Sequence, residues 1–511
     1  MLTRLKVNGF KNLMDVDVRF GPFTCIAGVN GSGKSNLFDA IRFLVALAEK
    51  PLVEAALSIV RGSGGRSADI RSLFHRVGDE YAKEMSFEAE MIIPSEGIDD
   101  LGQPVNATST FLRYDLKLAY TGRDGPWPSE PFQILSEELI RIPGTDFLAE
   151  SSFSHSADWS ESAIRSDAHA EAPVFSIRQG QPVFVHLGPP PYSGPGESMS
   201  LDTRIFPRTV LSSPSIGPIA SDATVILARQ EMSSWRVLHL DPSAMRTPDD
   251  VTAPAVVGSN GGHVAATLYS IAHEPPTDGR DPYEAETALY ARIAGRIRRL
   301  IGDVWDLTVE RDDKREEFTL YVTDRNGTRY SARELSDGTL RFLALAAIEE
   351  ERRPGVLCIE EPENGVHPGR IESLLNLLQA IAMDTRYPVE EGNPLRQVII
   401  STHSPSVVMR VPADSLVVAE LWPSHDDRGR FKRARFRGLA NTWRDPQPDR
   451  QSLALGTLLD YLNPEGYRPL PEPDPERDPD ADVRVMDRAD VHRMLSPTPR
   501  LSGWAPIRTH W

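Results

Sequence analysis

The segment "GVNGSGKS", from Gly28 to Ser35, constrains the fold of this chain more than any other stretch. It matches G-x-x-x-x-G-K-[ST], follows the apolar run "FTCIA" and precedes apolar residues at helical spacing, which is the strand–loop–helix context that the pattern requires. Its glycines allow a tight turn whose backbone N–H groups face phosphate oxygens, and the helix that follows adds partial positive charge. The alternative, a glycine-rich turn with a chance Lys-Ser pair, does not account for the flanking strand and helix. We predict a phosphate loop formed by Gly28, Asn30, Gly31, Ser32, Gly33, Lys34, Ser35 and Asn36, with Lys34 on the β- and γ-phosphates and Ser35 on Mg²⁺.

The second constraint is "VLCIEEPENGVHP", residues 356–368, in which a short apolar run ends in two adjacent acids, Glu360 and Glu361. Ligands bind at the carboxyl ends of the strands in open α/β sheets, so both acids are expected beside the phosphate loop. A bound Mg²⁺ would offset the desolvation of the carboxylates. We predict that Glu360 holds the Mg²⁺ shell, directly or through water, and that Glu361 is the base or the orienter of an attacking water. Without the phosphate loop, a solvated strand end would be the simpler interpretation.

Two further segments complete a recognisable order: "LSDGT" (335–339) before the acidic pair, and "VIISTHSP" (398–405) after it. This order resembles the head of ABC-type ATPases, in particular the SMC/RecF/OLD branch. The resemblance implies ATP and Mg²⁺ as cofactors, and an ATP-sandwiched homodimer or higher oligomer. It further implies that the signature segment (335–339) contacts the γ-phosphate of ATP on the opposite protomer and that His403 is the switch histidine of its own site. The implied signature residues are Ser336, Asp337 and Gly338.

Local alternatives remain open for these residues. Ser336 or Asp337 would serve equally as a plain helix N-cap, and a lone histidine after a strand is normally structural. The segment "NGFKNL" resembles the family's nucleotide-approaching N-terminal element, which makes Lys11 and Asn12 candidate nucleotide-binding residues. In the same family the loop after the acidic pair crosses to the other protomer, and Glu363, Asn364 and His367 occupy that place.

The segment "EEPENGVHP" (360–368) resembles the OLD-like branch of AAA family ATPases. Residues 50–330 carry no sustained heptads of the kind that an SMC coiled coil needs. The resemblance implies a switch that controls DNA or effector engagement in bacterial genome defence or DNA maintenance. Its effector would be a separately encoded nuclease, as in Septu- and PARIS-like systems. A fused TOPRIM nuclease is not expected, because Glu420 lacks the usual following glycine and "DPDAD" lies in a proline-rich stretch. The alternatives are an ATP-regulated nuclease with metal ligands in the C-terminal region, or a slowly hydrolysing ATP-bound scaffold.

The net charge and the lengths of the apolar runs limit which kinds of partner the chain is expected to have. The formal charge of −17 argues against a generally basic, nucleic-acid-coating surface, although it allows a local basic groove. The stretch "RGRFKRARFRG" (428–438) is either such a contact or, as we favour, a charged edge strand. No signal peptide is expected and no apolar run approaches about 20 residues, so we predict a cytoplasmic chain without a membrane partner. Cys25 and Cys358 lie in apolar β-like runs and are predicted to be buried free thiols.

The predicted fold class is α/β: an ABC ATPase head with a mainly parallel central sheet, an antiparallel β lobe and an inserted mixed α/β-helical region. The predicted domains are an N-terminal ATPase lobe (1–93), an insertion (94–305), a C-terminal ATPase lobe (306–422) and a C-terminal extension (423–511) with a Pro/acid-rich linker at 464–482. Within the insertion, 121–170 is expected to have little regular structure, and 222–236 and 282–303 are expected to be helical.

Overall fold

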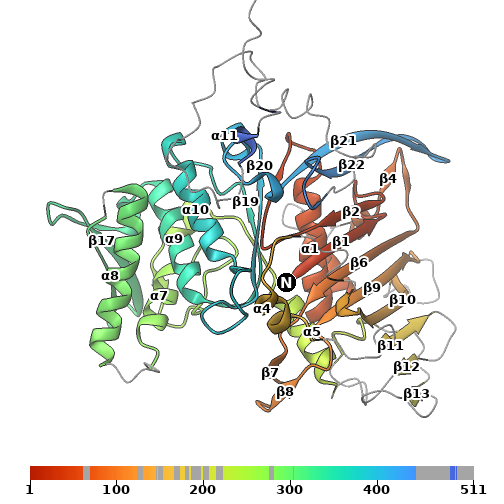
Figure 1. Ribbon diagram of the computed structural model, residues 1–511, viewed down its shortest axis with the longest axis horizontal. Helices are drawn as coiled ribbons and strands as arrows, with labels where there is room; N and C mark the ends of the chain where they lie inside the picture. The colour runs from red at the N-terminus through yellow and green to blue at the C-terminus, as the bar shows by residue number, and fades with distance from the viewer. Residues whose placement is uncertain are drawn as a thin grey trace, which may run out of the picture.

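The structure, a computed structural model, describes residues 1–60, 69–122, 131–145, 147, 153–165, 173–178, 183–185, 197–199, 207–213, 222–275, 281–302, 304–444, 484–488 and 491. Three parts are visible in Figure 1: a parallel sheet seen nearly edge-on at the centre, a helical lobe on the left, and a large antiparallel sheet on the right. No described helix is long and apolar enough to cross a membrane.

The central sheet has six described strands and carries the phosphate loop. Its strands, in spatial order, are β14 (Arg236–Leu238), β19 (Gly355–Glu360), β20 (Arg396–Thr402), β3 (Phe23–Ala27), β21 (Leu416–Asp426) and β22 (Gly429–Gly438). The first five are parallel, and β22 is an antiparallel edge strand. Both β3 and β20 are buried along their whole length, as expected for parallel strands covered on both faces.

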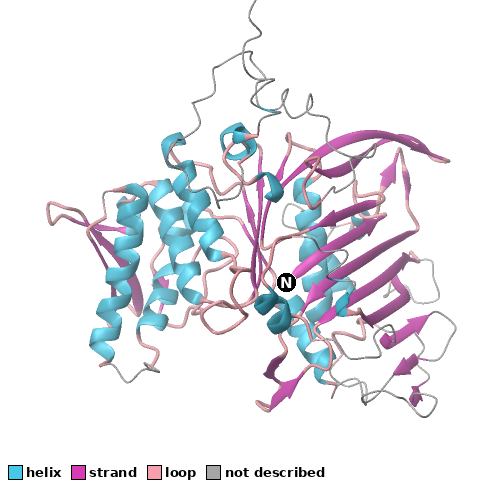
Figure 2. Ribbon diagram, viewed as in Figure 1, coloured by secondary structure: helices cyan, strands magenta, loops and turns pink. Residues whose placement is uncertain are grey.

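Helices cover the two faces of this sheet, and side chains alternate between them. Val356 and Cys358 of β19 pack in one core with α1 (Lys34–Glu49), which follows the phosphate loop. Leu357 and Ile359 point the other way, into a second core with α9 (Asp337–Glu351) and α10 (Ile371–Ile381). Figure 2 shows the same layers, with helices on either side of the central strands. The helix after the phosphate loop and the helix after the signature segment therefore lie on opposite faces of one sheet.

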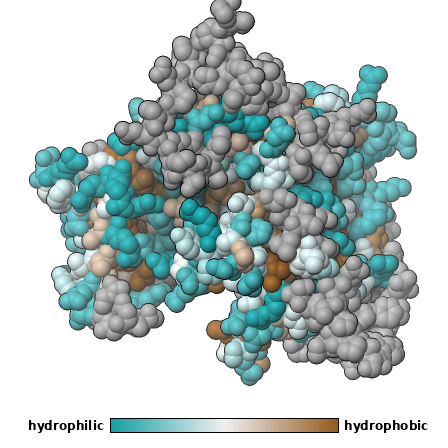
Figure 3. Space-filling model, in the orientation of Figure 1, coloured by the Kyte–Doolittle hydropathy of each residue, from teal (hydrophilic) through white to brown (hydrophobic). Residues whose placement is uncertain are grey.

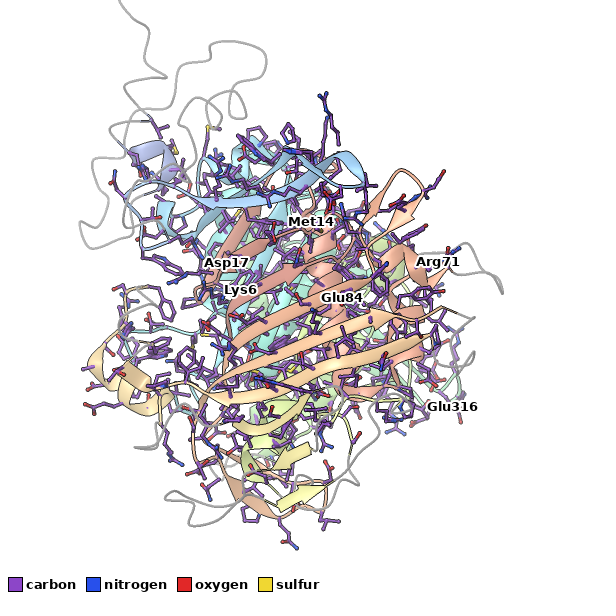
Figure 4. The ribbon with its side chains drawn as sticks, turned by 90° about the vertical axis from the view of Figure 1, so that its right-hand side faces the viewer. Lys6, Met14, Asp17, Arg71, Glu84 and Glu316 are labelled. Atoms are coloured by element: carbon purple, nitrogen blue, oxygen red, sulfur yellow. The ribbon has the colours of Figure 1, made fainter. Side chains whose placement is uncertain are left out.

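The antiparallel sheet packs its apolar face on α1. Its described strands, in spatial order, are β13 (Glu197–Met199), β12 (Val183–Val185), β11 (Pro173–Arg178), β10 (Phe132–Arg141), β9 (Phe111–Tyr120), β6 (Glu84–Ile92), β1 (Leu2–Asn8) and β2 (Val16–Arg19). Leu5 and Val7 face the core with α1, whereas Lys6 lies between them on the outer face. Figure 4 views that outer face, where Lys6, Asp17 and Glu84 lie along the strands.

The helical lobe is built on α9. Here α7 (Val264–Ala272) and α8 (Pro282–Ile301) pack on α9, next to a small antiparallel sheet of β15 (Asp249–Asp250), β16 (Asp306–Asp312), β17 (Glu317–Thr323) and β18 (Arg329–Ser331). The other described elements are α2 (Leu52–Ile59), α4 (Ala157–Ala163), α5 (Ala223–Ser233), α6 (Pro242–Met245), α11 (Pro405–Val408), β4 (Arg76–Val77), β5 (Glu80–Tyr81), β7 (Glu96–Ile98) and β8 (Pro104–Asn106), with 3-10 turns at Ile70–Leu73, Ala332–Glu334, Pro368–Arg370, Ala413–Ser415 and Val485–Asp487.

The predicted α/β class, with its mainly parallel central sheet and its antiparallel β lobe, is confirmed. The two cysteines are buried and free, as predicted. The domain division remains a prediction; strands from within 94–305 pair with both flanking segments, β9 with β6 and β14 with β19. The predicted linker at 464–482 lies outside the described residues.

One prediction about the insertion is wrong. Residues 121–170 contain β10, which pairs with β9 over its whole length, and the helix α4. A register shift between Ile134 and Ser136 interrupts the alternation of apolar and polar residues in β10, which hides the strand in the sequence. The helix α4 is short, but Ser156 caps it and Trp159 is fully buried against Phe153.

A second difference concerns 222–236. The helix α5 ends at Ser233, and the chain continues into β14 at the edge of the parallel sheet. Three residues are too few to show a strand period, so only the pairing of β14 with β19 identifies them as a strand.

Candidate functional site

The phosphate loop connects β3 to α1 and is shaped by close backbone packing. A Cβ at Gly28 would lie 2.5 Å from the Ala419 carbonyl oxygen, and a Cβ at Gly33 would lie 2.5 Å from the Cβ of Ala434. Gly33 also has a φ of 108°, in the left-handed region that favours glycine. Both positions therefore require glycine because strands β21 and β22 press on the loop from outside.

The open side of this loop suits an anion. A Cβ at Gly31 would have no neighbour within 4 Å, and within the described chain no side chain caps the first turn of α1. The Lys34 ammonium reaches back to two loop carbonyls, 2.5 Å from Gly28 O and 3.2 Å from Val29 O. Among the described residues, the buried Ser32 hydroxyl oxygen has no hydrogen-bond partner. These donors meet the fit expected of a phosphate cradle.

The predicted acids lie at the same edge of the sheet as the phosphate loop. Glu360 ends β19 and pairs in register with Ser401 of β20, which in turn pairs with Ile26 of β3, two residues before Gly28. The Glu360 carboxylate is 16% exposed, and the His239 ring nitrogen Nδ1 lies 3.9 Å from its Oε2. The parallel register thus brings Glu360 and the loop together across one intervening strand.

Both carboxylate oxygens of Glu361 are held by neighbouring side chains. Its Oε1 lies 2.8 Å from His403 Nδ1, and its Oε2 accepts a hydrogen bond of 2.7 Å from the side-chain amide of Asn364. Its backbone has a φ of 45°, which is unusual for a residue other than glycine and is common at functional sites. The strand end therefore turns sharply so that Glu361 points at the end of β20 instead of continuing β19.

Electrostatics keep Glu361 ionised. Burial raises its pKa, but hydrogen bonds from Asn364 and His403, together with the charges of His403 and Lys34, outweigh burial and place the pKa of Glu361 below its ordinary value. A carboxylate with a lowered pKa is a weak base, but it stays charged at neutral pH and still accepts hydrogen bonds. Of its two predicted roles, this environment favours orienting a water over abstracting its proton.

The N-terminal candidates lie against α1. The Lys11 ammonium is 2.6 Å from Asp39 Oδ2, and Asn12 Oδ1 accepts a hydrogen bond of 2.8 Å from the Asn36 amide. The Asn12 carbonyl accepts a further bond from the backbone of Ala434. Lys11 and Asn12 are thus brought next to the phosphate loop, where they connect α1 to strand β22.

The signature segment begins α9 on the opposite face of the sheet. Ser336 is the N-cap, accepting a hydrogen bond of 3.2 Å from the Thr339 backbone, so the N-cap alternative for Ser336 is correct as local structure. Asp337 pairs with Arg246 at 2.6 Å. A Cβ on Gly338 would lie 3.2 Å from the Gly365 carbonyl oxygen, so the helix start touches loop 361–367 of its own chain.

Loop 361–367 is more engaged within its own chain than the resemblance implied. Asn364 contacts Glu361, and Glu363 is buried, with Oε1 accepting a hydrogen bond from the Thr402 hydroxyl. His367 accepts a hydrogen bond from the Gly369 backbone through its own Nδ1. The support that Asn364 gives to Glu361 was missed; the signal was its spacing of three residues within a turn.

The basic stretch 428–438 is an edge strand, as favoured. Several of its cations pair with acids of the chain: Arg428 lies 2.6 Å from Asp426, Arg433 lies 2.8 Å from Asp15, and Arg437 lies 2.9 Å from Glu420. The guanidinium groups of Arg435 and Arg437 both stack on Trp422. In the space-filling view, hydrophilic residues predominate among those coloured by hydropathy, and hydrophobic residues show among them on the left-hand lobe (Figure 3).

Two family models match the chain. A model described as "RecF/RecN/SMC N terminal domain" matches residues 1–92, and a model described as "AAA domain, putative AbiEii toxin, Type IV TA system" matches residues 273–409. The first range contains the phosphate loop, and the second contains the signature segment, the acidic pair and His403. The two matches support ATPase activity of an SMC/RecF-like type for this chain. A comparison with curated proteins found no match.

Solved structures similar to the chain include SMC head domains. One is an SMC head bound to the C-winged helix domain of ScpA, with 13% identity, a TM-score of 0.43, and coverage of 85% of this chain and 97% of that chain. Another is an SMC head with an extended coiled coil, bound to the C-terminal domain of ScpA, from Pyrococcus furiosus (10% identity, TM-score 0.40, 85% and 96% coverage). A third is the SMC head domain of Thermotoga maritima (11% identity, TM-score 0.36, 86% and 99% coverage).

Proposed function

We propose that this chain is an ABC-type switch that dimerises around two ATP molecules and uses their hydrolysis to control the engagement of DNA or of an effector protein. Each composite site consists of the phosphate loop, the acidic pair and His403 from one protomer, and the signature segment from its partner.

The observation that carries this proposal is the position of Glu361. Its carboxylate is held by His403 and Asn364 at the edge of the sheet where the phosphate loop ends β3. Lys34 is close enough that its charge contributes to the lowered pKa of Glu361. A cation for phosphate and an oriented carboxylate for water are the two parts that phosphoryl transfer to water requires.

Different residues bind the phosphates, orient the water and hold the metal ion. The loop N–H groups and Lys34 bind the phosphates, and Glu361 orients the attacking water in line with the terminal phosphate. His403 contacts the Glu361 carboxylate and would contact the same phosphate when ATP is bound. Ser35 and Glu360 would hold Mg²⁺, which supplies charge neutralisation on the phosphate oxygens when bound.

The arrangement across two protomers is supported by the layers of the fold. The phosphate loop opens α1 on one face of the sheet, and Ser336 opens α9 on the other. A signature segment on the far face is better placed to meet a second protomer than the loop of its own chain. In a two-fold dimer, the phosphate loop of each protomer would face the signature segment of the other. This arrangement would create two equivalent sites.

Size measurement with nucleotide tests the proposal. Wild-type protein and Glu361→Gln are compared by light scattering, with and without ATP and Mg²⁺. We expect Glu361→Gln to accumulate as an ATP-bound dimer and the wild type to cycle back after hydrolysis. A variant that binds ATP but stays at one size would refute the composite site. Lys34→Ala is the matched control, because it should neither bind nucleotide nor change size.

The biological output forms part of the same proposal. The segment 360–368 resembles the OLD-like branch, and the family model over 273–409 is described with a toxin of a Type IV TA system. Both favour genome defence or DNA maintenance in the bacterial cytoplasm, with a separately encoded nuclease as effector. ATP turnover measured with and without double-stranded DNA tests whether the chain engages DNA. DNA cleavage by the isolated chain that survives Glu361→Gln would instead identify the chain as an ATP-regulated nuclease.

A further inference from the structure

A buried arginine on the signature helix lies beside loop 361–367. Arg341 is one turn after Gly338 and only 9% exposed. Its Nε and Nη2 donate to the carbonyl oxygen of Leu240, at 3.3 and 3.1 Å. Among the described residues, the third nitrogen, Nη1, is buried without a hydrogen-bond partner. Leaving a buried guanidinium N–H unsatisfied is unfavourable, so this atom calls for an explanation.

Loop 361–367 itself contains a buried acid, Glu363, and one of its carboxylate oxygens lacks a hydrogen-bond partner among the described residues. Glu363 is 7% exposed, and its Oε1 accepts a hydrogen bond from Thr402. Its Oε2 is buried and, within the described part of the chain, has no partner. Thr402 immediately precedes His403, so Glu363 is tied to the strand end that positions Glu361.

Arg341 approaches loop 361–367 at Gly365, two residues after Glu363. A Cβ on Gly365, which has a φ of 74°, would lie 3.4 Å from Arg341 Nη1 and 3.3 Å from Asp337 Cβ. The charge of Glu363 acts on Arg341, together with those of Asp337 and Asp241, against the burial that lowers the pKa of Arg341. A displacement of the loop past the start of α9 that brought Arg341 and Glu363 into contact would pair a buried cation with a buried carboxylate.

We propose that Arg341 is a positioning residue that pairs with Glu363 through Nη1 when bound ATP closes the dimer. The pair would join the signature helix, which serves the partner's nucleotide, to Thr402, His403 and Glu361, which serve the chain's own nucleotide. Each site thereby responds to the occupancy of the other, through a two-state contact between α9 and loop 361–367. This inference rests on the proposed function.

A double-mutant cycle tests the pair. Wild type, Arg341→Met, Glu363→Gln and the double variant are compared for dimerisation driven by a non-hydrolysable ATP analogue with Mg²⁺. We expect each single change to weaken dimerisation about 10-fold, and the double change to be no weaker than the worse single one, because both remove the same contact. Weakening that multiplies to about 100-fold in the double variant would overturn the pair.

Control variants separate coupling from folding. Without nucleotide, the losses in thermal midpoint should simply add, since the pair is not formed in that state. Arg396 is a similarly buried arginine bonded to backbone carbonyls of Ile381, Ile348 and Glu349. Arg396→Met should lower the midpoint and leave analogue-driven dimerisation unchanged. Arg341→Lys, which keeps the charge, should recover part of the dimerisation, and its failure to do so would count against the pair.

The outcomes also distinguish this inference from the proposed function. If the wild type does not dimerise with the analogue, the composite site fails and the pair fails with it. If the wild type dimerises but the cycle is additive, only the Arg341–Glu363 pair is overturned. Should Arg341→Met not fold, Arg341→Gln replaces it in the cycle, because glutamine can still donate to the carbonyl oxygen of Leu240.

Discussion

His403 Nδ1 lies 2.8 Å from Glu361 Oε1, and this contact joins the ends of two adjacent parallel strands, β20 and β19. The turn that makes it possible is the left-handed backbone of Glu361 itself. Because Asn364 holds the second carboxylate oxygen, the orientation of Glu361 is set before any substrate is present. Preorganisation of this kind lowers the cost of positioning a water for attack.

Replacing Glu361 by glutamine should abolish turnover and preserve nucleotide binding. Glutamine keeps the shape but loses the charge that orients the water, so we expect phosphate release to fall by about 10²–10⁴-fold. Steady-state phosphate release and equilibrium binding of labelled ATP measure the two effects. Glu310→Gln, at an exposed position of strand β16, is the matched control and should behave as wild type. Turnover in Glu361→Gln within a few-fold of wild type would remove Glu361 from the mechanism.

Removing the Asn364 side chain should move the acid limb of the pH–rate profile. The hydrogen bond from Asn364 favours the charged form of Glu361, so its loss raises the pKa of Glu361 toward the ordinary value. The acid limb of kcat/KM in Asn364→Ala should therefore shift to higher pH, and activity should be lost earlier on acidification. Asn326→Ala, in the turn between β17 and β18, should leave the limb in place. A shift to lower pH in Asn364→Ala would contradict the assignment.

Mixing two inactive variants should restore activity if the signature segment works across protomers. Lys34→Ala destroys the phosphate loop, and Ser336→Arg blocks the signature segment. In an equal mixture, half of the dimers carry both chains and each has one intact composite site, so about a quarter of wild-type turnover should return. Phosphate release as a function of mixing ratio measures this. A mixture that stays inactive while the two chains co-purify would show that both defects act on the same site.

Two glycines of the phosphate loop should differ in their tolerance of alanine. Both have a positive φ, which costs a non-glycine residue about 1–2 kcal/mol. A Cβ at Gly33 would also meet Ala434 Cβ at 2.5 Å, whereas Gly31 faces open space. Overpacking adds about 1–3 kcal/mol, so Gly33→Ala should lower the thermal midpoint clearly more than Gly31→Ala. Equal midpoints would mean that β22 does not press on the loop as described.

The sequence predicted the site better than the insertion, for physical reasons. The phosphate loop and the "EE" pair are local patterns whose chemistry demands fixed residue types at fixed spacing, and the parallel register then brings Glu360 and the loop to one edge. The strands β10 and β14 have no such signature. The period of β10 is broken by a bulge, and β14 is too short to have a period, so both are defined only by their pairing with distant strands.

The sequence also did not reveal which side chains pair with each other inside the site. Whether Asn364 faces a partner subunit or its own Glu361 depends on how sharply the backbone turns at Glu361, and sequence spacing does not give that angle. The contact of Gly338 with Gly365 likewise joins segments that belong to different elements. Long-range contacts of this kind follow from the packing of α9 on the sheet, not from a local pattern.

A buried acid in the antiparallel sheet should make stability depend on pH. Glu137 of β10 is fully buried; its oxygens accept hydrogen bonds from the backbone of Val210 and Leu211 and from the Tyr114 hydroxyl. Burial raises its pKa to about 7, although these hydrogen bonds oppose the shift. The raised pKa means that the folded state favours the protonated form.

The sign of the effect follows from this shift. The contribution of Glu137 is fully present below its ordinary pKa of 4.5 and is lost as pH rises through about 7. Over that window the free energy of unfolding should fall by up to about 3 kcal/mol. Glu137→Gln cannot titrate, so its stability should lose this component of the pH slope. Urea denaturation at several values between pH 5 and pH 8 measures the difference between the two proteins.

The neighbouring residue provides the control for this experiment. Burial raises the pKa of Glu138, but hydrogen bonds from Arg178 and Ser176 outweigh it, so the pKa of Glu138 is lowered. Its stabilising contribution is present above the ordinary pKa and is lost only on acidification below it. Between pH 5 and pH 8, Glu138→Gln should therefore keep the wild-type slope. If Glu137→Gln also keeps that slope, Glu137 is charged in the folded protein throughout this range, and its burial is compensated by the backbone of 210–211.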